Sequence, residues 1–171
     1  MSNEYNDFVR REIVTTRVFD APRALVFKAW TDPDQLRQWW GPRGFTHTFE
    51  TFDFRPGGTW KYVMHGPAGK DFQNEMRFVE IVEPERIVME HLSAPQFTLT
   101  AIFEELGSRT KLSFRQLFAT PELFDGVKRY AMQGNEENLD KLAEHLAALP
   151  ENAGFQAPED CVGFYPGMPG R

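Results

Sequence analysis

Residues 20–58 constrain the fold of this chain more than any other stretch. They begin with Asp20-Ala21-Pro22, reach Trp39-Trp40-Gly41-Pro42, and end with Asp53-Phe54-Arg55-Pro56-Gly57-Gly58. Asp20 is expected to cap a helix and Pro22 has the φ angle of a helix start, so this part predicts a helix, with a second short one ending at the tryptophans. Because two adjacent tryptophans before Gly-Pro are bulky and rigid, we expect a large apolar core to receive them.

The segments on either side of these helices read as β-strands. Residues 11–19 alternate in a strand-like way before the helices. Six further strands are expected at 46–54, 59–65, 73–82, 86–92, 97–106 and 109–118. The links between them are rich in Gly and Pro, which favour turns. Because these links are short, we predict an antiparallel meander.

Pro121 opens a long helical pattern that runs to about Leu149. Its apolar side chains recur on one stripe, formed by Phe124, Val127, Ala131, Leu139, Leu142 and Leu146. The predicted order is therefore β-α-α-β6-α in a single α+β domain covering residues 11–149. Residues 1–10 are expected to be an N-terminal extension.

Residues 150–171 differ in composition from the rest of the chain. They are rich in Pro and Gly, with Phe155, Phe164 and Tyr165 among them, and they show no periodicity. We expect a tail that is disordered or loosely packed; lying along the domain and docking on a second subunit are the alternatives.

Four motifs together carry a resemblance to a known family. They are residues 27–42 with the double tryptophan, Asp53 to Gly58, Pro84-Glu85-Arg86 before a strand, and Asn138-Leu139-Asp140-Lys141-Leu142 late in the last helix. In order and spacing they resemble the family typified by the C-terminal domain of the heat-shock-protein-90 ATPase activator, over roughly residues 12–149. That family lies within the helix-grip superfamily of START-like lipid-transfer domains, polyketide cyclases and the birch-pollen allergen. The resemblance implies a curved antiparallel sheet wrapped around the long C-terminal helix.

Composition excludes several classes of function. A net charge of −6 argues against a nucleic-acid partner, which requires a basic surface. The single cysteine, Cys161, excludes an intramolecular disulfide and a multi-thiolate zinc site, and fits a reducing compartment. No signal-peptide pattern and no apolar run long enough to span a membrane occurs. We therefore expect a cytoplasmic protein that does not insert into membranes.

A glycine interrupts the apolar stripe of the last helix, where Gly134-Asn135 stands between Ala131 and Leu139. Glycine inside a helix costs about 1 kcal/mol relative to alanine, so it is typical of a place where close approach or open volume is needed. One interpretation is a kink or tight packing against the double tryptophan. The other is that both residues form the roof of a ligand cavity, with Asn135 as a hydrogen-bonding group.

Alternation along the strands assigns side chains to the face that is expected to meet the long helix. Two polar residues, His91 and Gln116, fall on these otherwise apolar faces, where each needs a hydrogen-bond partner or a ligand. The candidate ligand-binding residues are therefore Trp60, Tyr62, Met89, His91, Phe97, Phe103, Phe114, Gln116, Gly134 and Asn135. The aromatic ones suit a flat or aliphatic hydrophobic molecule, or else they simply fill the core.

No catalytic or cofactor motif is evident. The four histidines, at positions 47, 65, 91 and 145, are scattered, and no spacing places two metal ligands on one element. Walker and dinucleotide-binding glycine patterns are absent as well. Asp53 and Arg55 are interpreted as a structural brace for the following glycines. We expect no cofactor and no metal, and no catalytic residue is assigned.

Three functions remain open. The first is binding of a hydrophobic small molecule in a cavity between sheet and last helix, which we favour. The second, implied by the resemblance, is a co-chaperone module that stimulates a chaperone ATPase; the presence of only one domain argues against it. The third is a polyketide-cyclase-like enzyme in which His91, Gln116 or Asn135 steers proton transfer. A homodimer is also compatible with the sequence.

Overall fold

The computed structural model describes residues 11–150 and confirms the predicted order of elements. The helices are α2 (Arg23–Thr31), α3 (Pro33–Trp39) and α4 (Pro121–Ala148). The strands are β1 (Glu12–Phe19), β2 (Thr46–Phe52), β3 (Thr59–His65), β4 (Asp71–Val82), β5 (Arg86–His91), β6 (Phe97–Leu106) and β7 (Arg109–Phe118). The N-terminal extension, the tail from residue 151 and Cys161 lie outside the described residues.

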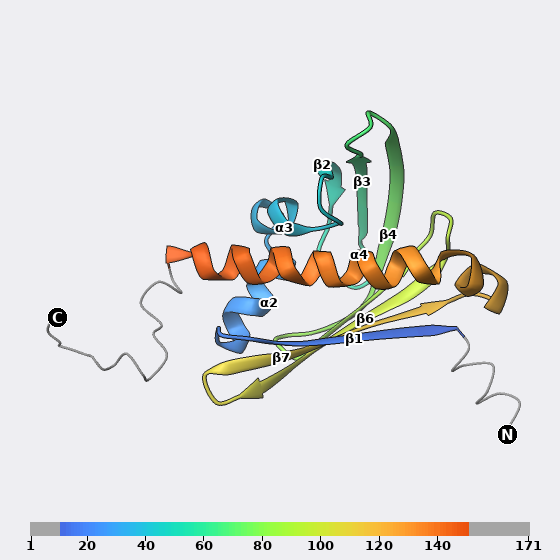
Figure 1. Cartoon of the computed structure of the whole chain (residues 1–171). Helices are drawn as coiled ribbons and strands as arrows, with labels where there is room; N and C mark the ends of the chain where they lie inside the picture. The colour runs from blue at the N-terminus through green and yellow to red at the C-terminus, as the bar shows by residue number, and fades with distance from the viewer. Residues whose placement is uncertain (1–10, 151–171) are drawn as a thin grey trace, which may run out of the picture.

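All seven strands form one antiparallel sheet in the order β1-β7-β6-β5-β4-β3-β2. The meander runs from β2 to β7, and β1 returns to pair with β7. Register shifts occur in β2 between Phe49 and Thr51 and in β4 between Phe78 and Glu80, where an extra residue bends the strand. The sheet therefore curves, and α4 crosses its concave face (Figure 1).

The tryptophans form one aromatic cluster at the end of the sheet covered by α2 and α3. The rings of Trp30, Trp39 and Trp40 lie 5.1–5.7 Å apart in edge-to-face arrangements, and all three side chains are buried. Trp39 Nε1 donates a hydrogen bond to the Ala29 carbonyl at 3.0 Å, which fixes α3 against α2. The expectation that a large apolar core receives the double tryptophan is confirmed.

The expected cap of the first helix is wrong. Pro22 is the N-cap of α2, and no side chain caps this helix. Asp20 lies two residues before this N-cap, and its Oδ1 accepts a hydrogen bond from Arg109 Nε at 2.8 Å. In α3 an aspartate does cap the helix, because Asp32 accepts from the Asp34 amide at 3.0 Å.

Residues 53–58 form a tight turn that docks on β4. Arg55 Nε donates to Asp53 Oδ2 at 2.8 Å, and the Gly58 amide donates to the Arg55 carbonyl at 2.7 Å. The Gly57 amide also donates to the Phe78 carbonyl at 2.7 Å. The pairing of Asp53 with Arg55 agrees with its interpretation as a structural brace.

Gly58→Ala should destabilise the protein by about 2–3 kcal/mol, because overpacking a rigid site strains the backbone. A Cβ atom at this position would lie 2.0 Å from the backbone oxygen of Asp53. The matched control is Gly126→Ala in α4, where nothing lies within 4 Å of the added carbon and a gain of about 0.5–1 kcal/mol is expected. Urea unfolding of both variants measures the difference; equal stability of Gly58→Ala and wild type would contradict the argument.

The two halves of α4 are buried to different extents. In the C-terminal half, Leu139, Leu142 and Leu146 are fully buried, and this half lies beside α2 and α3 (Figure 1). In the N-terminal half, Val127 and Ala131 are only half-buried. The predicted apolar stripe therefore packs tightly into the core along the C-terminal half of α4. Along the N-terminal half its side chains are less completely buried.

Hydrogen bonds join α4 to the loop that follows α3. We call Trp40, Gly41 and Pro42 the elbow. The Gly41 amide donates to Asn138 Oδ1 at 3.1 Å, and Lys141 Nζ donates to the Gly41 carbonyl at 3.2 Å. These contacts explain why Asn138 and Lys141 accompany the Trp-Trp-Gly-Pro motif in the same sequence.

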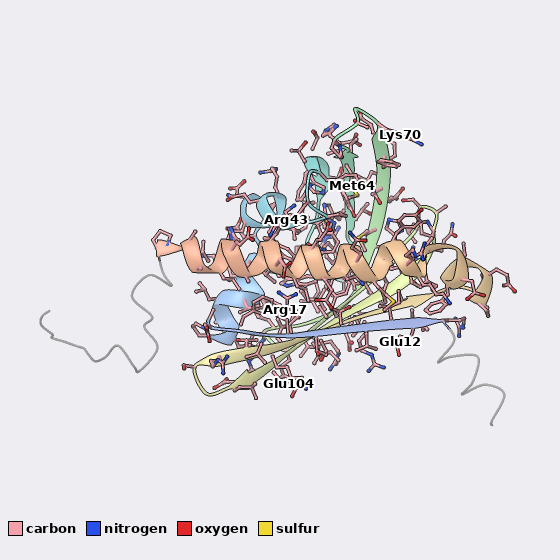
Figure 2. The ribbon with its side chains drawn as sticks, viewed as in Figure 1. Glu12, Arg17, Arg43, Met64, Lys70 and Glu104 are labelled. Atoms are coloured by element: carbon pink, nitrogen blue, oxygen red, sulfur yellow. The ribbon has the colours of Figure 1, made fainter. Side chains whose placement is uncertain are left out.

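Ion pairs hold α4 from both of its sides. Arg17 of β1 reaches Glu136 and Asp140, each at 2.8 Å, and Arg43 pairs with Glu144. Figure 2 shows Arg17 and Arg43 on opposite sides of the helix. Exposed pairs of this kind contribute little to stability, so we assign them mainly to orienting the helix.

Candidate functional site

A cavity of about 340 Å³ lies under the N-terminal half of α4. Its walls come from the concave faces of β3 to β7, from the elbow and from the helix. They are mostly aromatic and aliphatic, with Tyr62, Met64, Phe97, Leu99, Phe114, Phe118 and Val127 among the lining side chains. Tyr130 also lines the cavity and is 78% exposed, which places it at the mouth.

The structure brings seven of the ten sequence-predicted site residues together in this lining: Tyr62, His91, Phe97, Phe114, Gln116, Gly134 and Asn135. The other three, Trp60, Met89 and Phe103, are fully buried in the core instead. Trp60 packs against Trp40 at 5.3 Å between ring centroids, and Phe103 against Trp30 at 5.8 Å. They share a sheet face with the cavity residues, but the aromatic cluster covers them.

Sequence reasoning did not assign the elbow, Asn74, Asn138 or Tyr130 to the cavity. The sequence predicts only a core role for the two tryptophans, whereas in the structure Trp40 belongs both to the core and to the cavity wall. A usable signal was present for Asn138, because it follows Asn135 by three residues and so shares its helix face. The same signal was present for Tyr130, because it follows Val127 by three residues and precedes Gly134 by four.

Gly134 faces the elbow without breaking the helix. A Cβ atom here would make ordinary contact with Pro42 Cγ at 3.5 Å, and α4 continues through the position from Pro121 to Ala148. The glycine therefore does not interrupt α4, which is one element through this position. Gly134 lies in the cavity lining, where its missing side chain leaves open volume.

Gln116 and Asn135 form a buried amide pair between sheet and helix. Asn135 Nδ2 donates to Gln116 Oε1 at 3.0 Å, and the two residues are 7% and 8% exposed. Each of the two residues therefore has one hydrogen-bond partner, which is the other member of the pair. The pair also places amide groups in the wall of an otherwise apolar cavity.

Both ring nitrogens of His91 are engaged. Nδ1 lies 2.9 Å from the Pro95 carbonyl oxygen and Nε2 lies 2.7 Å from Asn74 Oδ1, and a neutral ring can donate to only one of these two oxygens. The ring stacks on Phe97 with centroids 4.5 Å apart. Burial lowers the pKa of His91, so the neutral form is favoured. Both ring nitrogens thus contact protein oxygens at the cavity wall, so His91 is not a free base.

The cavity wall carries no ionic side chain. Within residues 11–150, no Asp, Glu, Lys or Arg side chain lines it. Burial raises the pKa of Tyr62, whose hydroxyl oxygen accepts from Trp40 Nε1 at 3.1 Å. No group of three or more His, Cys, Asp or Glu residues that would hold a metal ion occurs in the described part of the chain. The site is therefore suited to a neutral, largely apolar molecule.

A second hollow of about 330 Å³ lies beyond His91, near the ends of β5 and β6. Arg77 and Glu90 are in its lining, and they pair with each other at 2.6 Å. Because Arg77 and Glu90 satisfy each other and Arg11 donates to the Phe118 carbonyl at 2.8 Å, this hollow is less suited to a ligand than the cavity under α4. Among residues 11–150, no helix has the length and apolar character needed to cross a bilayer.

His47 of β2 is the main acid-sensitive group next to the elbow. Its ring packs against Gly41, and neither ring nitrogen has a hydrogen-bond partner among residues 11–150. Burial, and to a smaller extent the charges of Lys141 and His65, lower the pKa of His47 to about 4. The folded protein therefore holds this ring neutral under conditions in which an unfolded chain would bind a proton.

The stability associated with His47 should be present above about pH 6.5 and decrease by about 2–3 kcal/mol as the pH falls to about 4. In that range the unfolded state binds a proton that the folded state excludes. Burial also lowers the pKa of His91 and His145, which adds to the same trend. Urea unfolding between pH 7 and 4 should show a shallower decrease for His47→Leu than for wild type. Identical slopes would contradict this origin.

The fold and the cavity define the class: the chain is a helix-grip protein, with a curved antiparallel sheet that holds a long C-terminal helix. Residues 20–147 match the family described as "Activator of Hsp90 ATPase homolog 1-like protein". The chain belongs to this family, and the resemblance found in its motifs is thereby confirmed.

Solved structures with the same fold come from several bacteria. A protein from Arthrobacter aurescens is 26% identical with a TM-score of 0.77, covering 84% of this chain and 90% of its own. One from Rhodobacter sphaeroides is 28% identical with a TM-score of 0.74, covering 82% and 94%. The "AHSA1" protein from Silicibacter pomeroyi, at 23% identity and a TM-score of 0.65, covers 80% and 97% and supports the fold alone. No curated protein sequence matches this chain.

Proposed function

We propose that this protein binds a small hydrophobic molecule in the cavity between the sheet and the N-terminal half of α4. The observation that carries the proposal is the cavity itself, at about 340 Å³ with a mostly apolar lining. Binding sites for small molecules have volumes of about 300–1,000 Å³ and combine apolar walls with a few polar groups. The buried amide pair and His91 are such groups.

The arrangement of α4 supports the same proposal. Its C-terminal half is anchored by buried leucines, by the elbow and by ion pairs, so that the helix is held in place by contacts that need no ligand. The N-terminal half covers the cavity with half-buried side chains only. A ligand would therefore bury apolar surface that the folded protein leaves partly exposed, which is the main source of favourable free energy for binding.

Thermal unfolding against a panel of fatty acids, sterols, flavonoids and polyketide-like aromatic compounds tests the proposal. A ligand at 100 times its dissociation constant adds about 2.7 kcal/mol, which corresponds to a shift of roughly 5–10 °C for a domain of this size. We expect a shift of that size for one chemical class. No shift for any class would overturn the proposal.

The family description favours one alternative, a module that acts on the ATPase of Hsp90. A change in the ATPase rate of a bacterial Hsp90 on addition of this protein, together with no shift in the ligand panel, would favour it. A cyclase-like enzyme is less well supported, because both His91 nitrogens are engaged and no ionic side chain of residues 11–150 lines the cavity. The cytoplasmic location expected from the single cysteine stays a prediction.

A further inference from the structure

The amide pair in the cavity wall restricts the chemistry of the ligand, and this inference rests on the function proposed above. Gln116 lies on β7 and Asn135 on α4, and both are more than nine-tenths buried while lining the cavity. Their single mutual hydrogen bond uses one donor and one acceptor. Each primary amide has further capacity, since it carries an NH2 group and a carbonyl oxygen.

The unused groups include the NH2 of Gln116 and the carbonyl oxygen of Asn135. Neither has a hydrogen-bond partner within residues 11–150. The two ends of an amide have nearly the same shape, so the pair can also turn over, with Gln116 donating to Asn135. In both arrangements one carbonyl oxygen of the pair has no donor, and N–H groups remain free, because each NH2 carries two hydrogens. An incoming group with a donor and an acceptor would satisfy that oxygen and one of these N–H groups.

A carboxylate does not match this pair. It has acceptors only, so one of its oxygens would face the free carbonyl oxygen of the pair. No Lys or Arg side chain in the described part of the chain lines the cavity to compensate for its charge. Burial of an unpaired carboxylate is costly, and the net charge of −6 opposes it further. A plain hydrocarbon fits the apolar wall but leaves both amides unsatisfied.

We propose that the ligand is a neutral, largely apolar molecule with a hydrogen-bond donor and an acceptor on adjacent atoms, as in a lactam. The N–H of such a group donates to the free carbonyl oxygen of the pair, and its C=O accepts from the free NH2. The apolar body then contacts Phe97 and Phe114, which lie in the same lining. In this role Gln116 and Asn135 determine specificity, while the aromatic wall contributes most of the binding free energy.

Four bicyclic probes of similar size test the inference by isothermal titration calorimetry at pH 7. They are isoquinolin-1(2H)-one, which has the N–H and C=O side by side, its N-methyl derivative, which lacks the donor, naphthalene, and 1-naphthoate. We expect the lactam to bind about 10- to 30-fold more tightly than the N-methyl lactam or naphthalene, as for two satisfied hydrogen bonds. Naphthoate should bind most weakly.

Substitutions at Gln116 and Asn135 test whether the amide pair causes the preference for the lactam over naphthalene. Gln116→Met keeps the size of the side chain but removes its amide, and should bind lactam and naphthalene with nearly equal affinity. Gln38→Met is the matched control, because Gln38 is exposed on α3, and it should keep the wild-type preference. If Gln116→Met does not fold, Asn135→Ala makes the same test from the helix side, where alanine favours the helix.

The outcomes separate this inference from the proposed function. Equal binding of lactam and naphthalene to wild type, or tightest binding of naphthoate, overturns the ligand class and leaves hydrophobic binding in place. If none of the four probes binds but a compound of the larger panel does, the ligand class is again overturned and hydrophobic binding stays in place. Failure of the probes and of the whole panel overturns both. A lactam preference that persists in both amide variants would show that other groups select the ligand.

Discussion

Trp39→Ala is expected to reduce the free energy of unfolding by about 3–5 kcal/mol, the range for removing a large aromatic side chain from a core. Trp39 is fully buried, with its ring 5.1 Å from that of Trp30 and 5.6 Å from that of Trp40. The substitution also leaves the Ala29 carbonyl without the donor that Trp39 Nε1 supplies. Trp40→Ala should cost a similar amount, but Trp40 also lines the cavity, so Trp39 gives the clearer result.

Urea unfolding followed by circular dichroism measures this loss without depending on tryptophan fluorescence. Tyr130→Ala is the matched control, since it removes an aromatic side chain that is 78% exposed, and a change within about 0.5 kcal/mol is expected. A loss below about 1 kcal/mol for Trp39→Ala would mean that the aromatic cluster does not hold α3 in the core. The α3 surface would then have to be reconsidered as a binding face.

Local chemistry allowed most of the fold to be predicted from the sequence. Strand alternation correctly placed Tyr62, Phe97 and Phe114 on the concave face, and turn residues such as Gly57-Gly58 separated the strands at nearly the right positions. Helix capping was less reliable. Asp20 and Asp32 both precede a proline in a helix start, yet only Asp32 caps its helix. The difference depends on one residue of spacing and on the competing partner Arg109, which is distant in sequence.

The candidate site could be predicted only in part, because the same alternation describes a filled core and a cavity wall. Trp60 and Tyr62 share one face of β3, but Trp60 lies under the aromatic cluster and Tyr62 reaches the cavity. Trp60 and Tyr62 differ because α2, α3 and the elbow cover one of them and end before the other. Where these elements end depends on tertiary packing. The partner of Gln116 is likewise 19 residues away on another element, so its pairing with Asn135 has no local signal.

Gly134→Leu is expected to weaken ligand binding by about 100-fold or more, equivalent to about 2.7 kcal/mol, while leaving the fold intact. The added side chain would start 3.5 Å from Pro42 and extend into the volume that the glycine leaves open in the cavity roof. Leucine is also a better helix former than glycine, so α4 itself should gain stability. A loss of binding together with unchanged or raised thermal stability is therefore the specific signature of a filled cavity.

Two substitutions on the same helix control for this interpretation. Gly126→Leu adds the same side chain where nothing lies within 4 Å of the added Cβ, and binding should be unchanged. Gly134→Ala adds a single carbon in ordinary contact with Pro42, so affinity should stay within about threefold of wild type. Calorimetric titration with the panel compound that most raises Tm provides the measurement. If Gly134→Leu binds that compound as well as wild type does, the ligand lies elsewhere, and the hollow beyond His91 becomes the next place to examine.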